Sequence, residues 1–485
     1  MSTTIPTTTL APDLKISKIL TGLWQIADME RDGQQLDLAV TAEHMDAYAQ
    51  SGLTTFDMAD HYGSAELIAG IYQNKTDAHP VQLLTKWVPE PGNNSKEKVR
   101  HAVQRSLDRL QTTQIDLLQY HAWNYADPQW LDDLFWLQEL KEEGLIRHIG
   151  LTNFDAAHLN LVLESGIKVV SNQISYSLID QRGKAAMTEV CLAHGVKILA
   201  FGTLAGGLLT SKWLGQKDRP ADQMSNWSQM KYKRFIDAAG GWDSFQNLLE
   251  KLQQIAQTKG VSIANIATKY MLEQPAVGGI IIGARLGESR HVASNLRLFD
   301  FDLSTEEQAQ IQEVLATFET IPGNCGDEYR KPPFLTASGD LSHHLNHLPV
   351  PYPAIETGPH RSKALSGTIW EDLAGFSRAV RIGDRILVSG TTATHGTRMI
   401  GGTDPAAQAQ FVLDKIEGAI QSLGGQLEDV VRTRIYIQRM QDWEPISKVH
   451  GRVFGTIQPA NTLIRADLIG EGYLVEIEAE AIVRS

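Results

Sequence analysis

Cysteine, long apolar runs and positive charge are all scarce in this sequence. Only two cysteines, Cys191 and Cys325, occur among the 485 residues. So few make a disulfide framework implausible and favour a reducing compartment, and we therefore expect a cytoplasmic protein. No apolar run reaches the roughly 18 residues that span a bilayer. The net charge of −13 argues against nucleic acid and anionic membrane surfaces as partners.

Two further sequence signals are missing. The opening stretch, MSTTIPTTTLAPDL, has no basic patch followed by an apolar core, so we expect a frayed tail and no signal peptide. No GxGxxG fingerprint is present, which argues against a dinucleotide-binding Rossmann domain. The overall composition, with 42% hydrophobic and 21% charged residues, is that of an ordinary soluble globular protein.

Short apolar runs alternate with amphipathic helical segments through the first two thirds of the chain. Eight strand and helix units in a row predict an α/β fold, a closed parallel (β/α)8 TIM barrel rather than an open sheet. The predicted strands are KILTGLW, TTFDMAD, QLLTKW, IDLLQYH, HIGLTN, VVSNQIS, KILAFG and GGIIIGA. The predicted helices lie near residues 35–51, 65–72, 96–110, 129–143, 156–164, 183–194, 242–259 and 289–295.

The seventh unit differs from the others. About thirty polar residues, including Trp213 and Trp227, precede its helix. Long insertions in compact domains are usually lids, binding loops or disordered segments, so we expect this loop to influence which substrate binds.

Residues 321–366 break the alternating pattern. They are rich in Pro, Gly and polar residues without sustained periodicity, which predicts a linker or an arm that wraps one domain. His343, His344 and His347 lie close together here. No carboxylate or cysteine completes a convincing ligand set around them, so we predict no metal site.

Residues 367–485 indicate a second, smaller domain of the α+β class. The stretch FSRAVRIGDRILVSG predicts a hairpin with a Gly-Asp turn. A helix at 406–423, the strand VVRTRIYIQ, a helix near 443–454 and the strands NTLIRADLI and LVEIEAEAIV follow it.

Polar residues recur where successive barrel strands end. Asp57 and Tyr62 follow an apolar run, Lys86 ends QLLTK, His121 ends IDLLQYH and Asn153 ends HIGLTN. Because the carboxyl ends of parallel strands meet at one face of a barrel, we expect these side chains to converge.

The four residue types Tyr, Lys, Asp and His suit one kind of chemistry. A tyrosine hydroxyl, with a reference pKa of about 10, is a poor acid at neutral pH. A lysine ammonium beside it favours the phenolate and makes proton donation easier, and an aspartate can hold that ammonium in place. A neutral imidazole can orient a substrate oxygen. These groups suit protonation of a carbonyl oxygen as hydride arrives at its carbon, which implies a reduced nicotinamide cofactor.

The motifs FDMADHYG, LLTKW and LLQYH resemble those of the aldo-keto reductases, a family with a Tyr/Asp/Lys/His tetrad at the strand ends of a barrel. The resemblance covers residues 14–320. It implies a reductase acting on aldehydes, ketones or aldoses, in which Tyr62 is the general acid. It also implies that Lys86 and Asp57 tune Tyr62 and that His121 orients the carbonyl.

The same resemblance implies a set of cofactor contacts. Asn153 and Gln173, with Thr152 beside them, would hold the nicotinamide carboxamide, and Phe201 would stack on its ring. GTLAGGLL resembles the loop that crosses the pyrophosphate, and IIGARLGESRHVASN resembles the adenosine-phosphate segment. The expected contacts in these two segments are Gly202, Leu204, Gly206, Gly283, Arg285 and Asn295.

The choice of cofactor depends on one departure from the family pattern. His291 stands where many NADPH-preferring members have arginine, which leaves Arg285 as the clearer partner for a 2′-phosphate. We expect NADP(H), with NAD(H) left open. Trp24 and Trp123 follow the first and fourth strands and could wall a substrate pocket or simply pack.

The tail motifs RILVSG, LEDVVRTRIYIQ, PAN and VEIEAEAIV resemble the Rid (YjgF-like) reactive-intermediate deaminases. This resemblance covers residues 368–485 and implies a chorismate-mutase-like fold and homotrimers with ligand clefts between subunits. Deaminases of that family hold the substrate carboxylate with an arginine directly after a Pro-Ala pair, where this chain has Asn461. Glu476 stands at the position of the family's cleft glutamate, where it could position a water or be an ordinary strand residue.

These resemblances leave three functional readings. The first is a fusion protein that reduces a small carbonyl substrate with NADPH and trimerises through its tail domain. The second is a nicotinamide-binding sensor with little turnover, although the intact tetrad argues against it. In the third, the tail domain binds a metabolite or is a second catalyst for an imine or enol.

Overall fold

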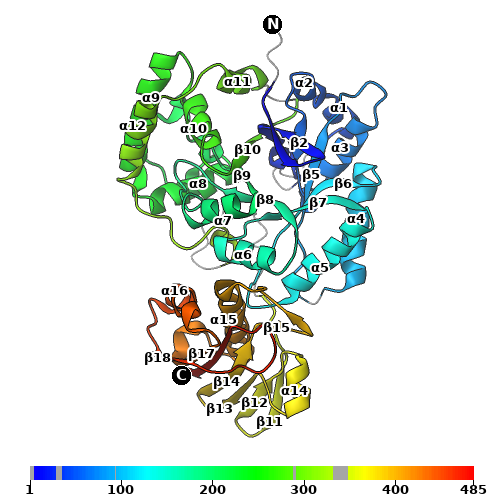
Figure 1. The fold of residues 1–485 in the computed structure, drawn as a ribbon. Coiled ribbons are helices and arrows are strands. Elements are labelled where there is room, and N and C mark those ends of the chain that lie inside the picture. Colours follow the sequence, from blue (N-terminus) through cyan, green and yellow to red (C-terminus); the bar gives the residue numbers. More distant parts are fainter. Residues whose placement is uncertain (1–4, 29–34, 93, 288–290, 331–347, 485) are drawn as a thin grey trace.

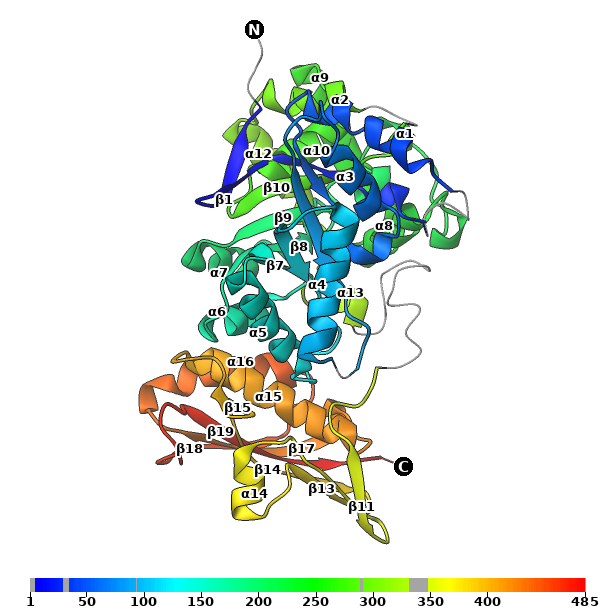
Figure 2. The same cartoon turned by 90° about the vertical axis from the view of Figure 1, so that its right-hand side faces the viewer.

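We describe the protein from a computed structural model covering residues 5–28, 35–92, 94–287, 291–330 and 348–484. A barrel and a smaller sheet domain lie one above the other (Figure 1). Seen from the side, two helices of the smaller domain lie between its own sheet and the barrel (Figure 2). Among the described residues, no helix is both long and apolar enough to cross a membrane.

Eight parallel strands close into a barrel in the order β10-β3-β4-β5-β6-β7-β8-β9, which confirms the predicted fold. Each predicted apolar run contains or overlaps one of these strands, because strands covered on both faces read as short, nearly continuous apolar segments. The runs HIGLTN and GGIIIGA begin two residues and one residue after the first residues of the strands that they overlap. The strands are β3 (Ile19–Gly22), β4 (Thr55–Asp57), β5 (Gln82–Trp87), β6 (Ile115–Tyr120), β7 (Ile146–Thr152), β8 (Val169–Ser175), β9 (Lys197–Phe201) and β10 (Val277–Gly283).

Helices surround the barrel, and α4 (Lys96–Leu110) shows why they form. Ser95 caps its first turn, and Val99, Val103 and Leu107 form a buried stripe at four-residue spacing. The other helices of this domain are α1 (Leu38–Glu43), α2 (Asp46–Ala49), α3 (Ala65–Gln73), α5 (Gln129–Glu142), α6 (Ala156–Glu164), α7 (Ala186–His194), α8 (Trp227–Ala238), α9 (Gly241–Lys259), α10 (Ile263–Leu272), α11 (Val292–Leu296), α12 (Thr305–Leu315) and α13 (Asp327–Arg330).

The start of the chain differs from the expected frayed tail. It forms an antiparallel hairpin of β1 (Thr7–Ala11) and β2 (Leu14–Ser17). Leu10, Leu14 and Ile16 of this hairpin are buried in one core cluster with leucines of the barrel strands. Those barrel leucines are Leu20, Leu84, Leu117 and Leu199. The hairpin stays ordered because it closes the barrel interior, a contact that the sequence of the tail alone does not reveal.

The long segment after β9 contains a helix that the sequence reading missed. Short 3₁₀ turns lead from β9 to α8, whose Tyr232, Phe235 and Ile236 are buried. The helices α10 and α12 were also not predicted. The polar residues between these apolar positions hid the helical spacing in α8.

A seven-stranded sheet in the order β11-β12-β13-β14-β19-β17-β18 forms the smaller domain. β13 and β14 are joined at Gly383 and Asp384, with φ of 61° at Gly383, which confirms the predicted hairpin turn. The sheet strands are β11 (Ala354–Gly358), β12 (Arg361–Ala364), β13 (Ala379–Ile382), β14 (Arg385–Thr392), β17 (Val430–Ile437), β18 (Ala460–Arg465) and β19 (Val475–Ile482). The remaining elements are the pair β15 (Thr394–His395) and β16 (Arg398–Met399) and the helices α14 (Ile369–Ala374), α15 (Pro405–Ser422) and α16 (Trp443–Phe454).

The described parts of residues 321–366 belong to both domains. α13 lies at the mouth of the barrel, and β11 and β12 extend the sheet. The segment therefore does more than link or wrap, although the exact domain boundaries stay predictions. His343, His344 and His347 lie outside the described residues.

The two domains share one hydrophobic core cluster and direct polar contacts. Asn160 donates to Asp404 at 2.9 Å, and His395 lies 2.9 Å from Asp132. At Gly418 of α15, a Cβ atom would lie 2.3 Å from the carbonyl oxygen of Ala126. Only glycine allows this approach, so the two domains pack as one unit at this point.

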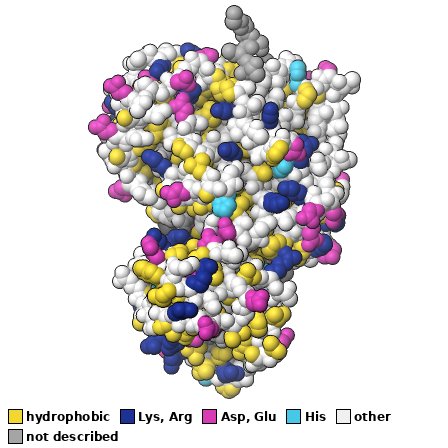
Figure 3. Space-filling view, viewed as in Figure 1, with side chains coloured by type: hydrophobic (Ala, Val, Ile, Leu, Met, Phe, Trp, Pro, Cys, Tyr) yellow, Lys and Arg dark blue, Asp and Glu magenta, His cyan; other side chains and the backbone are white. Residues whose placement is uncertain are grey.

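The sheet face turned away from the barrel carries exposed apolar side chains. Ile382, Leu387, Ile464 and Ile482 are each at least 41% exposed. Apolar side chains also gather on the smaller domain in the view of Figure 3. Large exposed apolar areas on a folded domain mark contact surfaces.

Candidate active site

The predicted tetrad converges at the carboxyl ends of neighbouring strands. Asp57 ends β4, Lys86 lies in β5, His121 follows β6, and Tyr62 lies in a 3₁₀ turn after β4. Lys86 Nζ donates to Asp57 Oδ2 at 2.6 Å and to the carbonyl oxygen of Met58 at 2.9 Å. The same ammonium lies 5.4 Å from the ring centroid of Tyr62.

Burial controls the charge of these groups. It lowers the pKa of the Lys86 ammonium, while the nearby Asp57 carboxylate opposes that shift. Burial, together with the charge of Arg330, lowers the pKa of His121 well below 6.5, so the imidazole is neutral. Neither ring nitrogen of His121 has a hydrogen-bond partner among the described residues.

Asp57 is fixed by two further side chains. Gln119 Nε2 donates to Asp57 Oδ1 at 2.9 Å, and Gln173 Nε2 donates to the same oxygen at 2.8 Å. Sequence reasoning missed Gln119, although the two-residue alternation of a strand places it on the same face as His121. Gln173, expected to hold the nicotinamide carboxamide, thus also serves the carboxylate of the tetrad.

A cavity of about 480 Å³ opens above these groups. It is lined by every barrel residue that the sequence indicated as a catalytic residue or as a cofactor or substrate contact. Those lining residues are Trp24, Asp57, Tyr62, Lys86, His121, Trp123, Thr152, Asn153, Gln173, Phe201, Gly202, Leu204, Gly206, Gly283, Arg285 and Asn295.

Asn153 is held in an unusual conformation beside the cavity. Its φ is 61°, and its backbone amide donates to the carbonyl oxygen of Gln173 at 2.8 Å. Its carbonyl oxygen accepts from Arg330 at 2.6 Å. Its side-chain oxygen is buried without a partner in the described structure. A buried amide oxygen in this state is an acceptor available to a ligand.

The glycines after β9 have different surroundings. A Cβ atom on Gly206 would lie 2.8 Å from the backbone of Ser228, so this glycine allows α8 to pack against the loop. A Cβ atom on Gly207 would meet nothing within 4 Å, and its φ is 90°. Of Gly206 and Gly207, both of which line the cavity, Gly207 is therefore the one whose backbone is open to a bulky ligand.

Aromatic rings surround the tetrad. The ring centroids of Trp24 and Tyr62 lie 5.0 Å apart, and those of Trp123 and His121 lie 4.5 Å apart. Trp123 Nε1 also donates to the carbonyl oxygen of Pro89 at 2.7 Å, which fixes its indole. The two tryptophans expected to form a substrate wall are thus next to the proposed acid and to the imidazole.

α13 contributes two residues that sequence reasoning missed. The Tyr329 ring lies 5.9 Å from that of His121. Arg330 donates to the carbonyl oxygens of Ala122 at 3.0 Å and Asn153 at 2.6 Å, and so joins two strand ends at the barrel mouth. The Pro- and Gly-rich surroundings of α13 gave no periodic signal that could have found these contacts.

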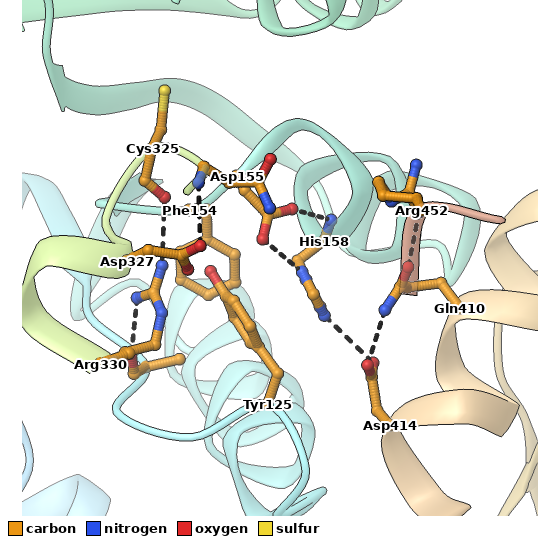
Figure 4. A network of polar contacts seen from close by, with 12 residues as sticks. Tyr125, Phe154, Asp155, His158, Cys325, Asp327, Arg330, Gln410, Asp414 and Arg452 are labelled. Carbon is orange, nitrogen blue, oxygen red and sulfur yellow. Dashed lines mark hydrogen bonds and ion pairs between the residues drawn. The ribbon is translucent and has the colours of Figure 1, made fainter. Parts of the chain in front are cut away.

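A polar network leads from this mouth to the smaller domain (Figure 4). His158 of α6 lies 2.8 Å from Asp155 and 3.1 Å from Asp414 of α15, and Tyr125 stacks on its ring at 3.5 Å. Burial alone would lower the pKa of His158, but the two carboxylates raise it to about 9. The charged imidazole therefore ties the two domains together close to Asn153.

The two residues expected in the Rid-like cleft lie on opposite sheet faces of one chain. Asn461 is opposite Thr433 and accepts a hydrogen bond from its hydroxyl at 3.2 Å, whereas Glu476 is opposite Tyr436. Positions three residues apart on β17 face opposite sides. Burial and the charge of Glu478 raise the pKa of Glu476. Within one chain, the structure does not bring the pair together.

Family models match both domains. The model described as "Aldo/keto reductase family" matches residues 18–316, and the one described as "Endoribonuclease L-PSP" matches residues 370–483.

Individual proteins match the two parts separately. Aldo-keto reductase YhdN of Bacillus subtilis is 25% identical over 341 residues, which cover 66% of this chain and 96% of that protein. The uncharacterized protein SCO2049 of Streptomyces coelicolor is 36% identical over 117 residues, or 24% of this chain and 87% of that protein. The solved structure of glycerol dehydrogenase AKR11B4 from Gluconobacter oxydans matches with a TM-score of 0.53 at 22% identity, covering 64% of this chain and 95% of that one. This last likeness supports the fold.

Proposed function

Because this chain belongs to the aldo/keto reductase family and continues into a Rid/YjgF-like domain, we propose that its barrel reduces a carbonyl to an alcohol with a nicotinamide cofactor. The observation that carries this proposal is the buried pair of Lys86 and Asp57, which lies beside Tyr62 and opens into the cavity. Such a pair next to a tyrosine and a neutral imidazole suits protonation of a carbonyl oxygen.

Tyr62 gives its hydroxyl proton to the carbonyl oxygen in this proposal. The Lys86 ammonium, 5.4 Å from the ring centroid, stabilises the phenolate that remains. Asp57 holds this ammonium, and the amides of Gln119 and Gln173 hold Asp57. The donor is therefore positioned before the substrate arrives.

His121 orients the substrate. Its low pKa keeps the imidazole neutral, so one ring nitrogen carries a proton and the other does not. Neither nitrogen has a partner in the described residues, so the N–H is available to the carbonyl oxygen. A neutral donor aligns this oxygen without competing with Tyr62 for proton transfer.

The residues around the cavity fit a nicotinamide cofactor. The side-chain oxygen of Asn153, which has no partner within the described parts of the chain, can accept from a carboxamide, and the open backbone at Gly207 admits a phosphate. When bound, the reduced nicotinamide supplies the hydride that adds to the carbonyl carbon. We propose as its contacts Thr152, Asn153, Gln173, Phe201, Gly202, Leu204, Gly206, Gly283, Arg285 and Asn295.

We propose NADPH as the preferred cofactor, with NADH as the alternative. Arg285 and His291 both line the cavity, together with Asn295. A guanidinium presents several N–H donors in a planar fork that suits a 2′-phosphate, whereas an imidazole offers at most two. Arg285 would therefore account for most of the preference for NADPH over NADH.

The test is turnover by the purified full chain. Oxidation of NADPH and NADH is followed with aromatic aldehydes, dicarbonyls and aldoses, together with equilibrium binding of each dinucleotide. We expect turnover with at least one class and higher kcat/KM with NADPH. Tight dinucleotide binding without turnover in either direction would contradict the reductase and favour the sensor.

For the Rid/YjgF-like domain, we propose a trimerising module that can bind a metabolite. The exposed apolar side chains of Leu387, Ile464 and Ile482 on the outer sheet face support a contact between copies. Asn461 offers no charge for a substrate carboxylate, so the bifunctional alternative with deamination has less support.

Native mass measurement tests the trimer. We expect a mass of three chains for the wild type and of one chain for Ile464→Glu combined with Leu387→Glu. A wild type that stays monomeric at micromolar concentration would remove the scaffold role.

A further inference from the structure

The cavity has an excess of positive charge. Among its described lining residues, Asp57 is the one carboxylate, whereas Lys86, Lys231 and Arg285 are cations. Lys86 is paired with Asp57 at 2.6 Å. Lys231, which the sequence did not indicate, has no carboxylate within ion-pair distance among the residues that the structure describes.

Lys231 lies in a cage of aromatic rings. It comes from α8, in the long segment after β9, and is only 7% exposed. Its ammonium lies 5.4 Å from the ring centroid of Phe201, 5.8 Å from that of Tyr232 and 4.4 Å from that of Tyr329. It also donates a hydrogen bond to the hydroxyl of Tyr329. Ring faces attract a cation but do not neutralise it, so an anion is still needed to balance this charge.

The position of Lys231 favours the substrate over a purely structural role. The Tyr329 ring contacts the Lys231 ammonium, and its centroid lies 5.9 Å from that of the His121 ring. His121 is the group that would orient the carbonyl. The Tyr329 ring is therefore a neighbour of both the group that would orient the carbonyl and the ammonium that would bind an acidic group.

We propose that Lys231 binds a carboxylate of the substrate, so that the barrel acts on aldehydes or ketones that carry an acidic group. This inference rests on the proposed reductase function. The carboxylate is not altered: hydride adds to the carbonyl carbon, the Tyr62 proton goes to the carbonyl oxygen, and the acidic group only anchors the molecule. The cofactor's phosphates are the other source of negative charge that could reach Lys231, and the test separates the two.

The test compares two substrates of matched shape. 4-Formylbenzoate carries a planar carboxylate, and 4-nitrobenzaldehyde carries a neutral nitro group of similar size. The ratio of their kcat/KM values, measured in the wild type and in Lys231→Met, cancels the difference in intrinsic reactivity. We expect this ratio to fall about 10-fold to 100-fold in Lys231→Met, as for loss of a hydrogen bond to a charged group. Lys231→Arg should restore most of the wild-type ratio of the two kcat/KM values.

Lys233 provides the matched control. It lies on the same helix, is also buried, and pairs with Asp237 and with Asp218, the latter at 3.0 Å, while it does not line the cavity. Lys233→Met makes the same change of charge two residues away. It should leave the substrate ratio unchanged within about twofold.

Binding measurements keep this proposal distinct from the reductase function. The dinucleotide-loaded protein is titrated with 4-(hydroxymethyl)benzoate and with 4-nitrobenzyl alcohol, the two alcohol products. Tighter binding of the carboxylate that is lost in Lys231→Met but kept in Lys233→Met supports the proposal, even if no aldehyde turns over. Equal discrimination in wild type and Lys231→Met overturns it. Weaker dinucleotide binding with unchanged discrimination also overturns it and assigns Lys231 to the cofactor's phosphates.

Discussion

The barrel mouth and the domain interface each hold a buried ionic cluster. At the mouth, Lys86 lies 2.6 Å from Asp57. At the interface, His158 lies 2.8 Å from Asp155 and 3.1 Å from Asp414. None of these five side chains is more than 8% exposed. By distance and burial, the two clusters are alike.

They differ in what surrounds the charges. Around the interface cluster, Asp414 also accepts from Gln410 at 2.6 Å, and Gln410 accepts from Arg452 at 2.5 Å (Figure 4). The hydroxyl of Tyr125, whose ring stacks on His158, has no partner in the described part of the chain, but neither residue lines the cavity. At the mouth, His121 and Asn153 line a cavity and keep buried atoms that find no partner among the residues the structure describes. The cavity is therefore what separates the two clusters: a buried ion pair without one indicates structure, while a pair that opens into a cavity with available donors and acceptors indicates chemistry.

Replacing Lys86 by Met should have the largest effect. We expect kcat/KM to fall by roughly 10²-fold to 10⁴-fold, because proton donation by Tyr62 loses its supporting charge. The free energy of unfolding should also fall by about 3–5 kcal/mol, since Asp57 remains buried without its cation. Steady-state kinetics and denaturant unfolding measure the two changes. Adding Asp57→Asn should restore much of the stability but none of the turnover, and a fully active Lys86→Met would contradict this role.

The two buried histidines should give opposite pH dependences of stability. In the folded protein the pKa of His121 is lowered, so the unfolded chain binds a proton at this imidazole more readily than the folded one does. The contribution of His121 to stability is therefore lost as pH falls below about 6.5. The pKa of His158 is raised to about 9. Its contribution is complete below about 6.5 and is lost as pH rises through about 9, by up to about 3 kcal/mol.

Unfolding midpoints between pH 5 and pH 10 test this difference. His158→Gln should flatten the alkaline side of the wild-type profile and leave its acid side unchanged. His121→Gln should flatten the acid side. If the alkaline loss persists in His158→Gln, another group is responsible and the charged imidazole does not hold the interface.

The smallest predicted effects concern the interface carboxylates. Asp414→Asn should lower the free energy of unfolding by about 2 kcal/mol, because His158 loses one of its two charged acceptors. Asp132, which pairs with His395 but is 34% exposed, is the control. Asp132→Asn should cost less than about 1 kcal/mol. Denaturant unfolding gives both values, and loss of turnover in a folded Asp414→Asn would break the distinction between the two clusters.

The sequence predicts the barrel and the residues at its mouth because both follow local rules. Asp57, Lys86 and His121 each stand where an apolar run ends, and parallel strands bring such ends to one face. Gln119 could also have been predicted, because residues two apart on a strand share a face and Gln119 is two residues before His121. The roles of these residues in catalysis stay proposals.

The remaining contacts join distant segments and have no local signal. His158 and Asp414 are 256 positions apart. Tyr329 follows a Gly-rich stretch, and Lys231 comes from a polar insertion, so neither shows a pattern that points to the cavity. The N-terminal hairpin is likewise ordered only by the barrel that it closes. Tertiary packing, rather than local preference, decides all of these.

The proposed reaction depends above all on Tyr62 as the proton donor in this cavity. Its most direct test is Tyr62→Phe, with dinucleotide binding measured beside reduction of the best aldehyde. We expect a dinucleotide affinity within about twofold of the wild type and a kcat/KM lower by about 10²-fold or more. A Tyr62→Phe variant that turns over as fast as the wild type would contradict it, because the proton would then come from another group.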